Sequence, residues 1–236
     1  MMRKIAFFSV LLLCACVGKE NNTKKSEIIL LSEAIQKDPT NTILLLDRAN
    51  YNKELNNLES ALFDLTQCVK LDSLNPDFHY LVAEIYFELS KRKNANAKYP
   101  SLVKNHLTKA IVLDDKDHKS QALLGELMLA YAKYKEAINC FNYSLKIEYN
   151  QAKTHMLMGY AFKQLGQDDN AINCFRNSVN VNPEFKEGLV QLGQMYHVKG
   201  DTSAVVYYNN ALQLDSTDEM TLYNKALFYQ SIMDWN

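Results

Sequence analysis

The sequence predicts an all-α protein built from tandem helix pairs, and three observations support that prediction. The segment AINCF at 137–141 recurs unchanged at 171–175. Gly125, Gly159 and Gly193 are separated by the same interval, and large apolar residues surround them at helical spacing. The 236 residues include only seven Gly and four Pro, which is too few for a turn-rich β-sandwich or barrel.

The composition excludes several other classes of protein. Apolar residues make up 47% of the chain, charged residues 22%, and the formal net charge is −1. These values are typical of a globular protein, and they exclude pervasive disorder and a membrane protein with many spans. A near-neutral chain also lacks the concentrated basic charge with which proteins bind nucleic acids.

The periodic pattern resembles the tetratricopeptide repeat, a helix-turn-helix unit of 34 residues. That repeat has a small residue at its eighth position, a large one at the eleventh, and small, aromatic and small residues at the twentieth, twenty-fourth and twenty-seventh. The resemblance implies a right-handed superhelix of about five repeats with flanking half-repeats. The expected units are a half-repeat at 26–41, repeats at 42–75, 76–117, 118–151, 152–185 and 186–218, and a terminal helix at 219–236.

Small residues are expected where the two helices of each repeat approach most closely, with large residues filling the remaining gaps. These repeat-packing positions are Ala49, Ala83, Gly125, Ala137, Gly159, Ala171, Gly193 and Ala204. The flanking half-repeats follow the same pattern. Leu31 and Ala34 match a lone second helix, whereas Leu222, Ala226 and Tyr229 match a lone first helix.

The second repeat contains eight extra residues, which lie within 88–99 (ELSKRKNANAKY). Insertions in repeat proteins form loops on one face, which is often a binding face. The basic residues of this insertion could bind an acidic partner or lipid headgroups. Alternatively, the insertion is only a solvated extension of the two helices.

The resemblance also implies where a ligand binds, because first helices line the concave face of such arrays. The expected peptide-binding groove consists of Leu46, Asn50, Tyr80, Glu84, Phe87, Glu126, Met156, Tyr160, Lys163, Gln194 and Tyr223. This mixture of aromatic, apolar and acidic side chains suits a peptide or a helix with apolar anchors. The carboxylate clamp of chaperone-docking members is absent, because Leu46 and Leu81 replace two of its polar residues.

The sequence contains no motif for catalysis, for a cofactor or for a metal ion. His79 and His155 share the fourth repeat position, which favours packing over metal binding. Cys140 and Cys174 occupy equivalent positions on neighbouring repeats, about 10 Å apart. A disulfide requires Cα atoms within about 7 Å, so we expect none between them. The chain is therefore expected not to be an enzyme.

The N-terminal residues 1–15 resemble a bacterial lipoprotein signal peptide. Arg3 and Lys4 precede an apolar stretch that is too short to span a bilayer. Leu13 and Ala15 then stand before Cys16 as in a lipobox, so the resemblance implies a lipid on Cys16. Residues 16–25 would form a flexible tether. The alternative is a plain secretory signal with incidental cysteines.

Together these features predict a non-enzymatic scaffold for protein–protein interactions. It would be anchored by lipid in the outer membrane, facing the periplasm, and would assist assembly or recruitment of an envelope complex. The alternative is a surface-exposed lipoprotein that binds an extracellular ligand. The expected partners are a protein or peptide in the concave groove and the membrane, with no nucleic acid. A homodimer through the terminal helix around Phe228 and Trp235 stays open.

Overall fold

The computed structural model describes residues 24–233, and every regular element in that range is an α-helix, which confirms the predicted all-α fold. The expected signal peptide, Cys16 and Trp235 lie outside the described residues. A first helix covers residues 24–37. It is followed by α2 (Thr42–Glu54), α3 (Leu58–Leu71), α4 (Pro76–Ser90), α5 (Tyr99–Leu113), α6 (His118–Ala130), α7 (Tyr134–Ile147), α8 (Ala152–Gln164), α9 (Asp168–Val181), α10 (Lys186–Val198), α11 (Ser203–Leu214) and α12 (Glu219–Met233).

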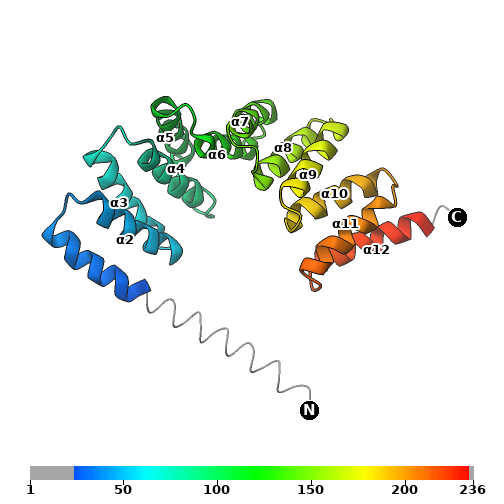
Figure 1. Ribbon diagram of the computed structural model, residues 1–236, viewed down its shortest axis with the longest axis horizontal. Coiled ribbons are helices and arrows are strands. Elements are labelled where there is room, and N and C mark those ends of the chain that lie inside the picture. Colours follow the sequence, from blue (N-terminus) through cyan, green and yellow to red (C-terminus); the bar gives the residue numbers. More distant parts are fainter. Residues whose placement is uncertain (1–23, 234–236) are drawn as a thin grey trace, which may run out of the picture. The chain divides into compact units, whose positions relative to one another are not determined.

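The chain divides into two compact units, residues 1–115 and 116–236, which we call unit 1 and unit 2. Unit 1 contains the helix at 24–37 and α2 to α5, and unit 2 contains α6 to α12. Within each unit, consecutive helices pair as hairpins (Figure 1). The helices α2, α4, α6, α8, α10 and α12 begin at the first residues of the expected repeats.

Short polar residues start several of the first helices. The side chain of Asn41 accepts hydrogen bonds from the backbone N–H groups of Ile43 and Leu44. Asn75 accepts one from Asp77, and Pro76 follows it at the first helical position. Such side chains satisfy amide groups that have no partner inside the helix, and proline loses nothing there because its missing N–H would be unpaired.

A residue in the left-handed region separates the two helices in every complete repeat except the second. These residues are Asn56, Ala132, Gly166 and Gly200, with φ angles of 59°, 55°, 69° and 67°. All four occupy the fifteenth position of their repeat. Glycine adopts this conformation without steric cost, whereas alanine at position 132 does not. The turn is therefore imposed by the packing of the helices and not only by the local residue.

All eight expected repeat-packing residues are buried. In unit 2 the eighth-position glycine of each repeat faces an aromatic ring of the second helix. A Cβ atom added to Gly125, Gly159 or Gly193 would lie 2.5, 2.8 or 2.7 Å from a ring carbon of Phe141, Phe175 or Tyr208. In unit 1 the equivalent pairs are Ala49 with Leu65 and Ala83 with Leu107, all buried. Glycine at the eighth position is thus paired with an aromatic residue at the twenty-fourth position, and alanine at the eighth is paired with leucine.

The insertion of the second repeat lengthens both helices and adds a linker at 91–98. Helix α4 has 15 residues, whereas the other first helices of complete repeats have 13. Helix α5 also has 15 residues, whereas the other second helices have 12 to 14. Lys91 donates to Glu88 at 2.7 Å, and Arg92 pairs with Glu59 at 2.5 Å. Acidic groups of the same unit therefore neutralise two of the four basic residues in this segment.

The first helices of unit 2 form a continuous row. Helix α8 contacts both α6 and α10, and α10 contacts α12, in addition to the contacts within and between successive hairpins. The second helices α7, α9 and α11 do not form a comparable row. A stack in which only the first helices touch along its length must curve toward them. The first helices therefore line the inner side of unit 2.

Candidate functional site

The inner side of unit 2 exposes aromatic and aliphatic side chains from α8 and α12. Tyr160 is 40% exposed, Tyr223 is 59% exposed and Leu227 is 36% exposed. All three occupy the fifth or ninth position of a first helix, so they lie on one face of the row. Met156 and Gln194 lie half-buried among them. We call the face formed by these five residues the inner face.

Polar groups bordering the inner face are fixed by interactions within unit 2. Lys153 of α8 donates to Glu126 of α6 at 2.6 Å. The ring of His197 packs edge-on against Phe228, with 5.3 Å between ring centroids. Lys163 is half-buried on α8. A ligand here would meet a preformed apolar strip with an ion pair at one end, which suits a peptide that carries apolar anchors.

The expected groove residues of unit 1 offer less accessible surface. Leu46 packs against two apolar clusters, and Glu84 forms an ion pair with Lys53. Tyr80 is half-buried, whereas Asn50 is exposed. Asn50 lines a pocket of about 400 Å³ whose other residues are Glu27, Leu31, Asp47, Tyr51 and Glu54.

The expectation that Phe87 contacts a ligand is wrong, because its side chain is buried, with 6% exposure. Helix α4 continues to Ser90, so Phe87 lies inside the helix instead of near its end. The ammonium group of Lys91 lies over the ring, 4.3 Å from its centroid. The insertion therefore removes this residue from the accessible face. Phe228 is likewise buried, against Ala204 and Tyr208, so it cannot form a dimer contact.

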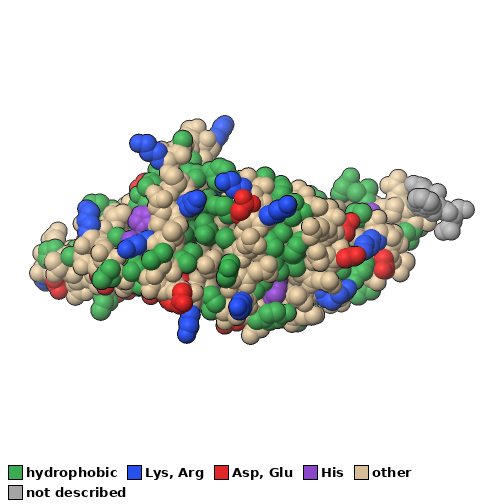
Figure 2. Space-filling model, turned by 90° about the horizontal axis from the view of Figure 1, so that it is seen from above, with side chains coloured by type: hydrophobic (Ala, Val, Ile, Leu, Met, Phe, Trp, Pro, Cys, Tyr) green, Lys and Arg blue, Asp and Glu red, His purple; other side chains and the backbone are tan. Residues whose placement is uncertain are grey.

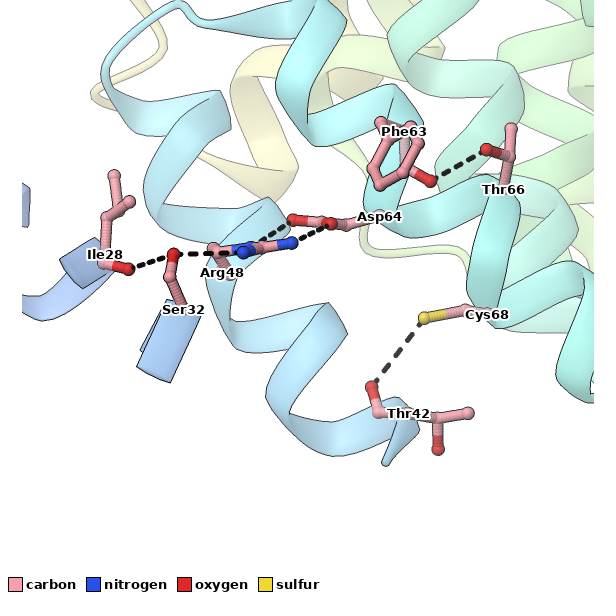
Figure 3. A network of polar contacts seen from close by, with 8 residues as sticks. All are labelled: Ile28, Ser32, Thr42, Arg48, Phe63, Asp64, Thr66 and Cys68. Carbon is pink, nitrogen blue, oxygen red and sulfur yellow. Dashed lines mark hydrogen bonds and ion pairs between the residues drawn. The ribbon is translucent and has the colours of Figure 1, made fainter. Parts of the chain in front are cut away.

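A polar network in unit 1 was not among the expected sites. Arg48 of α2 donates to both carboxylate oxygens of Asp64, at 2.9 and 2.6 Å, and to the hydroxyl of Ser32 at 3.0 Å (Figure 3). Ser32 in turn donates to the carbonyl of Ile28. The network ties the helix at 24–37 to α2 and α3. The hydrogen bond to Asp64 and its negative charge raise the pKa of Arg48, although desolvation opposes them.

Arg48 and Asp64 border an open pocket of about 480 Å³. Its other lining residues are Ile28, Ser32, Asn52, Glu59, Ser60 and Phe63. One sequence signal could have revealed this network. Arg48 occupies the seventh repeat position, where the other complete repeats have Val82, Leu124, Met158 and Leu192. A charged residue at a position that is otherwise apolar requires a buried partner.

The described residues hold little reactive chemistry. Residues 24–233 contain no group of three potential metal ligands. Cys68, Cys140 and Cys174 are unpaired, in agreement with the expectation of no bridge between the last two. Burial raises the pKa of Cys68 and of Cys174 to about 11, so both thiols are protonated and weakly nucleophilic at neutral pH.

Two histidines at the fourth repeat position form hydrogen bonds with the loop that precedes their helix. Nε2 of His79 lies 3.1 Å from the carbonyl of Ser73, and Nε2 of His155 lies 3.0 Å from that of Tyr149. A carbonyl only accepts, so each Nε2 carries the proton. Nδ1 of neutral His79 therefore accepts from Nδ1 of His106, 3.1 Å away. Both histidines serve packing and hydrogen bonding, as the sequence predicted.

These buried imidazoles make the stability dependent on pH. Desolvation, and then the charge of His79, lower the pKa of His106. Desolvation also lowers the pKa of His155, although its bond to Tyr149 opposes the effect. The unfolded chain, with an ordinary pKa of 6.5, therefore binds more protons. We expect urea unfolding to require less free energy as the pH falls from 7.5 to 5.5, by at most about 1.4 kcal/mol per pH unit per histidine.

The control is the double variant His106→Gln with His155→Gln, measured in the same buffers. Its stability should depend less steeply on pH over this range, because carboxylates with ordinary pKa values near 4 remain ionised throughout. An equally steep dependence in the double variant would assign the effect to other groups.

The surface carries both signs of charge. Basic and acidic side chains are interspersed among apolar and other polar residues on the face drawn in Figure 2. Within residues 24–233, no helix has the length and apolar character needed to cross a membrane. The fold and the inner face define a helical-repeat protein whose candidate site is an extended surface formed by successive first helices.

Comparison with known proteins identifies the kind of repeat. The sequence model of the family described as "Tetratricopeptide repeat" matches residues 152–185, which contain α8 and α9. The chain is 24% identical over 201 residues to "DnaJ homolog subfamily C member 7" of Mus musculus. That alignment covers 84% of this chain and 38% of the relative, so the chain spans about two fifths of that protein's length.

Solved structures show the same fold. "Functional Characterization of Pseudomonas Aeruginosa pilF" gives a TM-score of 0.71 at 15% identity, covering 84% of this chain and 87% of the other. "Crystal structure of YrrB: a TPR protein with an unusual peptide-binding site" gives 0.59 at 18% identity, covering 83% and 97%. The chain therefore has the fold of a tetratricopeptide-repeat protein, and the hairpin at 152–185 is one such repeat.

Proposed function

We propose that this protein is a non-enzymatic scaffold that binds a peptide or a partner helix on the inner face of unit 2. The observation that carries the proposal is the exposure of Tyr160, Tyr223 and Leu227 along one row of first helices. Apolar side chains gathered on one face of a rigid array supply binding energy without reorganisation. The peptide-binding site of YrrB, a protein of the same fold, supports the same class of ligand.

We further propose that a lipid on Cys16 anchors the scaffold in the outer membrane, facing the periplasm, where it assists assembly or recruitment of an envelope complex. The basis is the sequence alone: two basic residues, a short apolar stretch and Leu13, Ala15 and Cys16 in lipobox order. Several acyl chains on one residue would give stable attachment, whereas one chain gives only marginal binding.

The inner face can be tested by substituting its two tyrosines. Tyr160→Ala with Tyr223→Ala should reduce capture of the partner in cross-linked cells, followed by mass spectrometry, by at least about tenfold, since buried aromatic anchors dominate binding energy. Circular dichroism and melting should change little, because both side chains are exposed. Undiminished capture would place the partner elsewhere on the protein.

The matched control is Tyr131→Ala with Tyr143→Ala, which removes two exposed tyrosines of unit 2 outside the inner face. This variant should capture the same proteins as the natural chain. Cys16→Ser separates the anchor from the groove: loss of membrane attachment with unchanged capture means that the lipid only determines location. If Cys16→Ser stays fully membrane-bound, the lipid proposal fails while the inner face remains testable.

A further inference from the structure

The eleventh position of the first repeat lacks the large residue that the other complete repeats have there. In those repeats the residue is half-buried and packs against an apolar cluster; it is Tyr86, Met128, Phe162 or Tyr196. The first repeat has Asn52 instead, which is buried. An asparagine fills less space than any of these side chains, so the first repeat leaves room beside α2 that the same fold fills elsewhere.

This room is the open pocket of about 480 Å³ that Arg48 and Asp64 border, and we call it the Arg48 pocket. Asn52 is part of its lining, and its walls come from three helices: the helix at 24–37, α2 and α3. The volume is within the range of about 300–1,000 Å³ that is typical of ligand pockets. The pocket therefore originates from the small size of one residue within α2.

The apolar part of the lining suits an aromatic ring. Phe63 of α3 borders the pocket, and its side chain is 61% exposed. Ile28 of the helix at 24–37 supplies a second, half-buried apolar side chain. An exposed ring beside a pocket gives an incoming ring a partner for stacked or edge-on contact, which aromatic pairs prefer.

The polar part of the lining offers hydrogen-bond donors. The guanidinium of Arg48 uses three of its five N–H bonds, two with Asp64 and one with Ser32 (Figure 3). The other two have no acceptor among residues 24–233, and the side chain is 19% exposed. Asp64 already balances the charge of Arg48, and Glu59 adds a negative charge to the lining. A neutral acceptor therefore suits the pocket better than an anion does.

The fifth repeat shows how a tyrosine occupies the equivalent space. The ring of Tyr196, at the eleventh position, stacks on Tyr207 with 5.4 Å between centroids and 5° between planes. Its hydroxyl accepts a hydrogen bond of 2.9 Å from Arg176. The Arg48 pocket offers the same two groups, a guanidinium from Arg48 and a ring from Phe63, without the tyrosine.

We propose that the Arg48 pocket binds a tyrosine side chain of a partner protein. The phenol ring takes the place of the missing large residue, over Asn52 and against Phe63, and its hydroxyl accepts a hydrogen bond from Arg48. The pocket lies in unit 1, so this site is separate from the inner face of unit 2 and does not depend on it.

Titration of the isotope-labelled full chain with N-acetyl-tyrosinamide tests the proposal, with the backbone amides followed by NMR. The amides of the pocket lining should shift, with a dissociation constant of about 1–10 mM, since a ligand of this size binds weakly. N-acetyl-phenylalaninamide, which lacks the hydroxyl, should bind about tenfold more weakly. N-acetyl-phosphotyrosinamide should bind no more tightly than the tyrosine derivative.

Three results of this titration would overturn the proposal. The first is the absence of shifts in the pocket lining at about 20 mM N-acetyl-tyrosinamide, well above the expected dissociation constant. The second is tighter binding of the phosphotyrosine derivative, which would make the pocket an anion site. The third is a set of shifts confined to α8 and α12, which would assign the ligand to the inner face.

Asn52→Tyr fills the pocket with a side chain of the protein itself. The variant should keep its helicity and melt no lower than the natural chain, because the second and fifth repeats carry tyrosine at this position. Its affinity for N-acetyl-tyrosinamide should fall at least about tenfold, because the ring and the ligand need the same space. Undiminished binding by the folded variant would show that the ligand does not enter the pocket.

Phe63→Ala and Ile29→Ala form a matched pair that leaves the buried residues intact. Both natural residues occupy the twenty-second position of a second helix and are 61% exposed, but only Phe63 lines the pocket. Phe63→Ala should weaken binding of N-acetyl-tyrosinamide at least about threefold, because an aromatic contact is lost. Ile29→Ala should bind like the natural chain. Equal affinities of the two variants would contradict the proposed contact with Phe63.

Discussion

Replacing Asp64 with alanine is expected to destabilise unit 1 by about 2–4 kcal/mol. The substitution leaves the guanidinium of Arg48 without its bidentate partner, and removing one member of a buried ion pair typically costs about 3–5 kcal/mol. Asp64 is fully buried, with a side-chain exposure of 2%, whereas that of Arg48 is 19%. Partial hydration of Arg48 reduces the expected loss. Urea unfolding followed by circular dichroism measures it.

The control is the double variant Arg48→Met with Asp64→Leu, which replaces the pair by apolar side chains of similar size. Such replacements are often neutral or stabilising, because the desolvation penalty of both charges disappears. The double variant should therefore be more stable than Asp64→Ala. A smaller loss in Asp64→Ala than in the double variant would show that the charges are hydrated and the network contributes little.

Replacing Gly125 with alanine is expected to destabilise unit 2 by about 1–3 kcal/mol. The added Cβ would lie 2.5, 2.6 and 3.0 Å from three ring carbons of Phe141, whose side chain is fully buried and cannot move aside. Overpacking of this kind typically costs about 1–3 kcal/mol or more, and the better helix propensity of alanine offsets up to about 1 kcal/mol. Urea titration of the variant measures the difference.

The compensating change is Phe141→Leu, which recreates the Ala–Leu pair of unit 1. Gly125→Ala with Phe141→Leu should lose less stability than the sum of the two single variants, by at least about 1 kcal/mol, since residues in direct contact are energetically coupled. Strict additivity would show that Gly125 is not required by the ring.

Much of the fold could be predicted from the sequence, because the same small and large residues recur at the packing positions of successive repeats. The interval between Gly125, Gly159 and Gly193 indicated where the helices approach, and all eight expected packing residues are buried. The absence of a disulfide between Cys140 and Cys174 followed from the spacing of stacked hairpins. Small residues at a constant interval mark close contacts between neighbouring helices. In a repeat protein these contacts involve only adjacent repeats, so they can be predicted without knowing the rest of the structure.

The candidate site could be predicted only in part. Tyr160 and Tyr223 are exposed on first helices as expected, because the residues around them keep the repeat period. The burial of Phe87 could not be predicted, because the repeat pattern does not indicate where α4 ends within the insertion. The ion pair of Arg48 with Asp64 was missed, because it joins residues whose contact depends on how three helices pack.

By itself, the sequence determined the kind of protein: an array of helix pairs, the residues at their closest contacts, and the half-repeats that flank them. These properties depend on periodic spacing and side-chain volume, which can be read from a linear chain. Only the tertiary structure decided which side chains remain accessible. The exposure of a side chain depends on neighbours that are distant in sequence: Arg48 is held by its hydrogen bonds to Asp64. It also depends on where a helix ends: α4 continues far enough for the ammonium group of Lys91 to lie over the ring of Phe87.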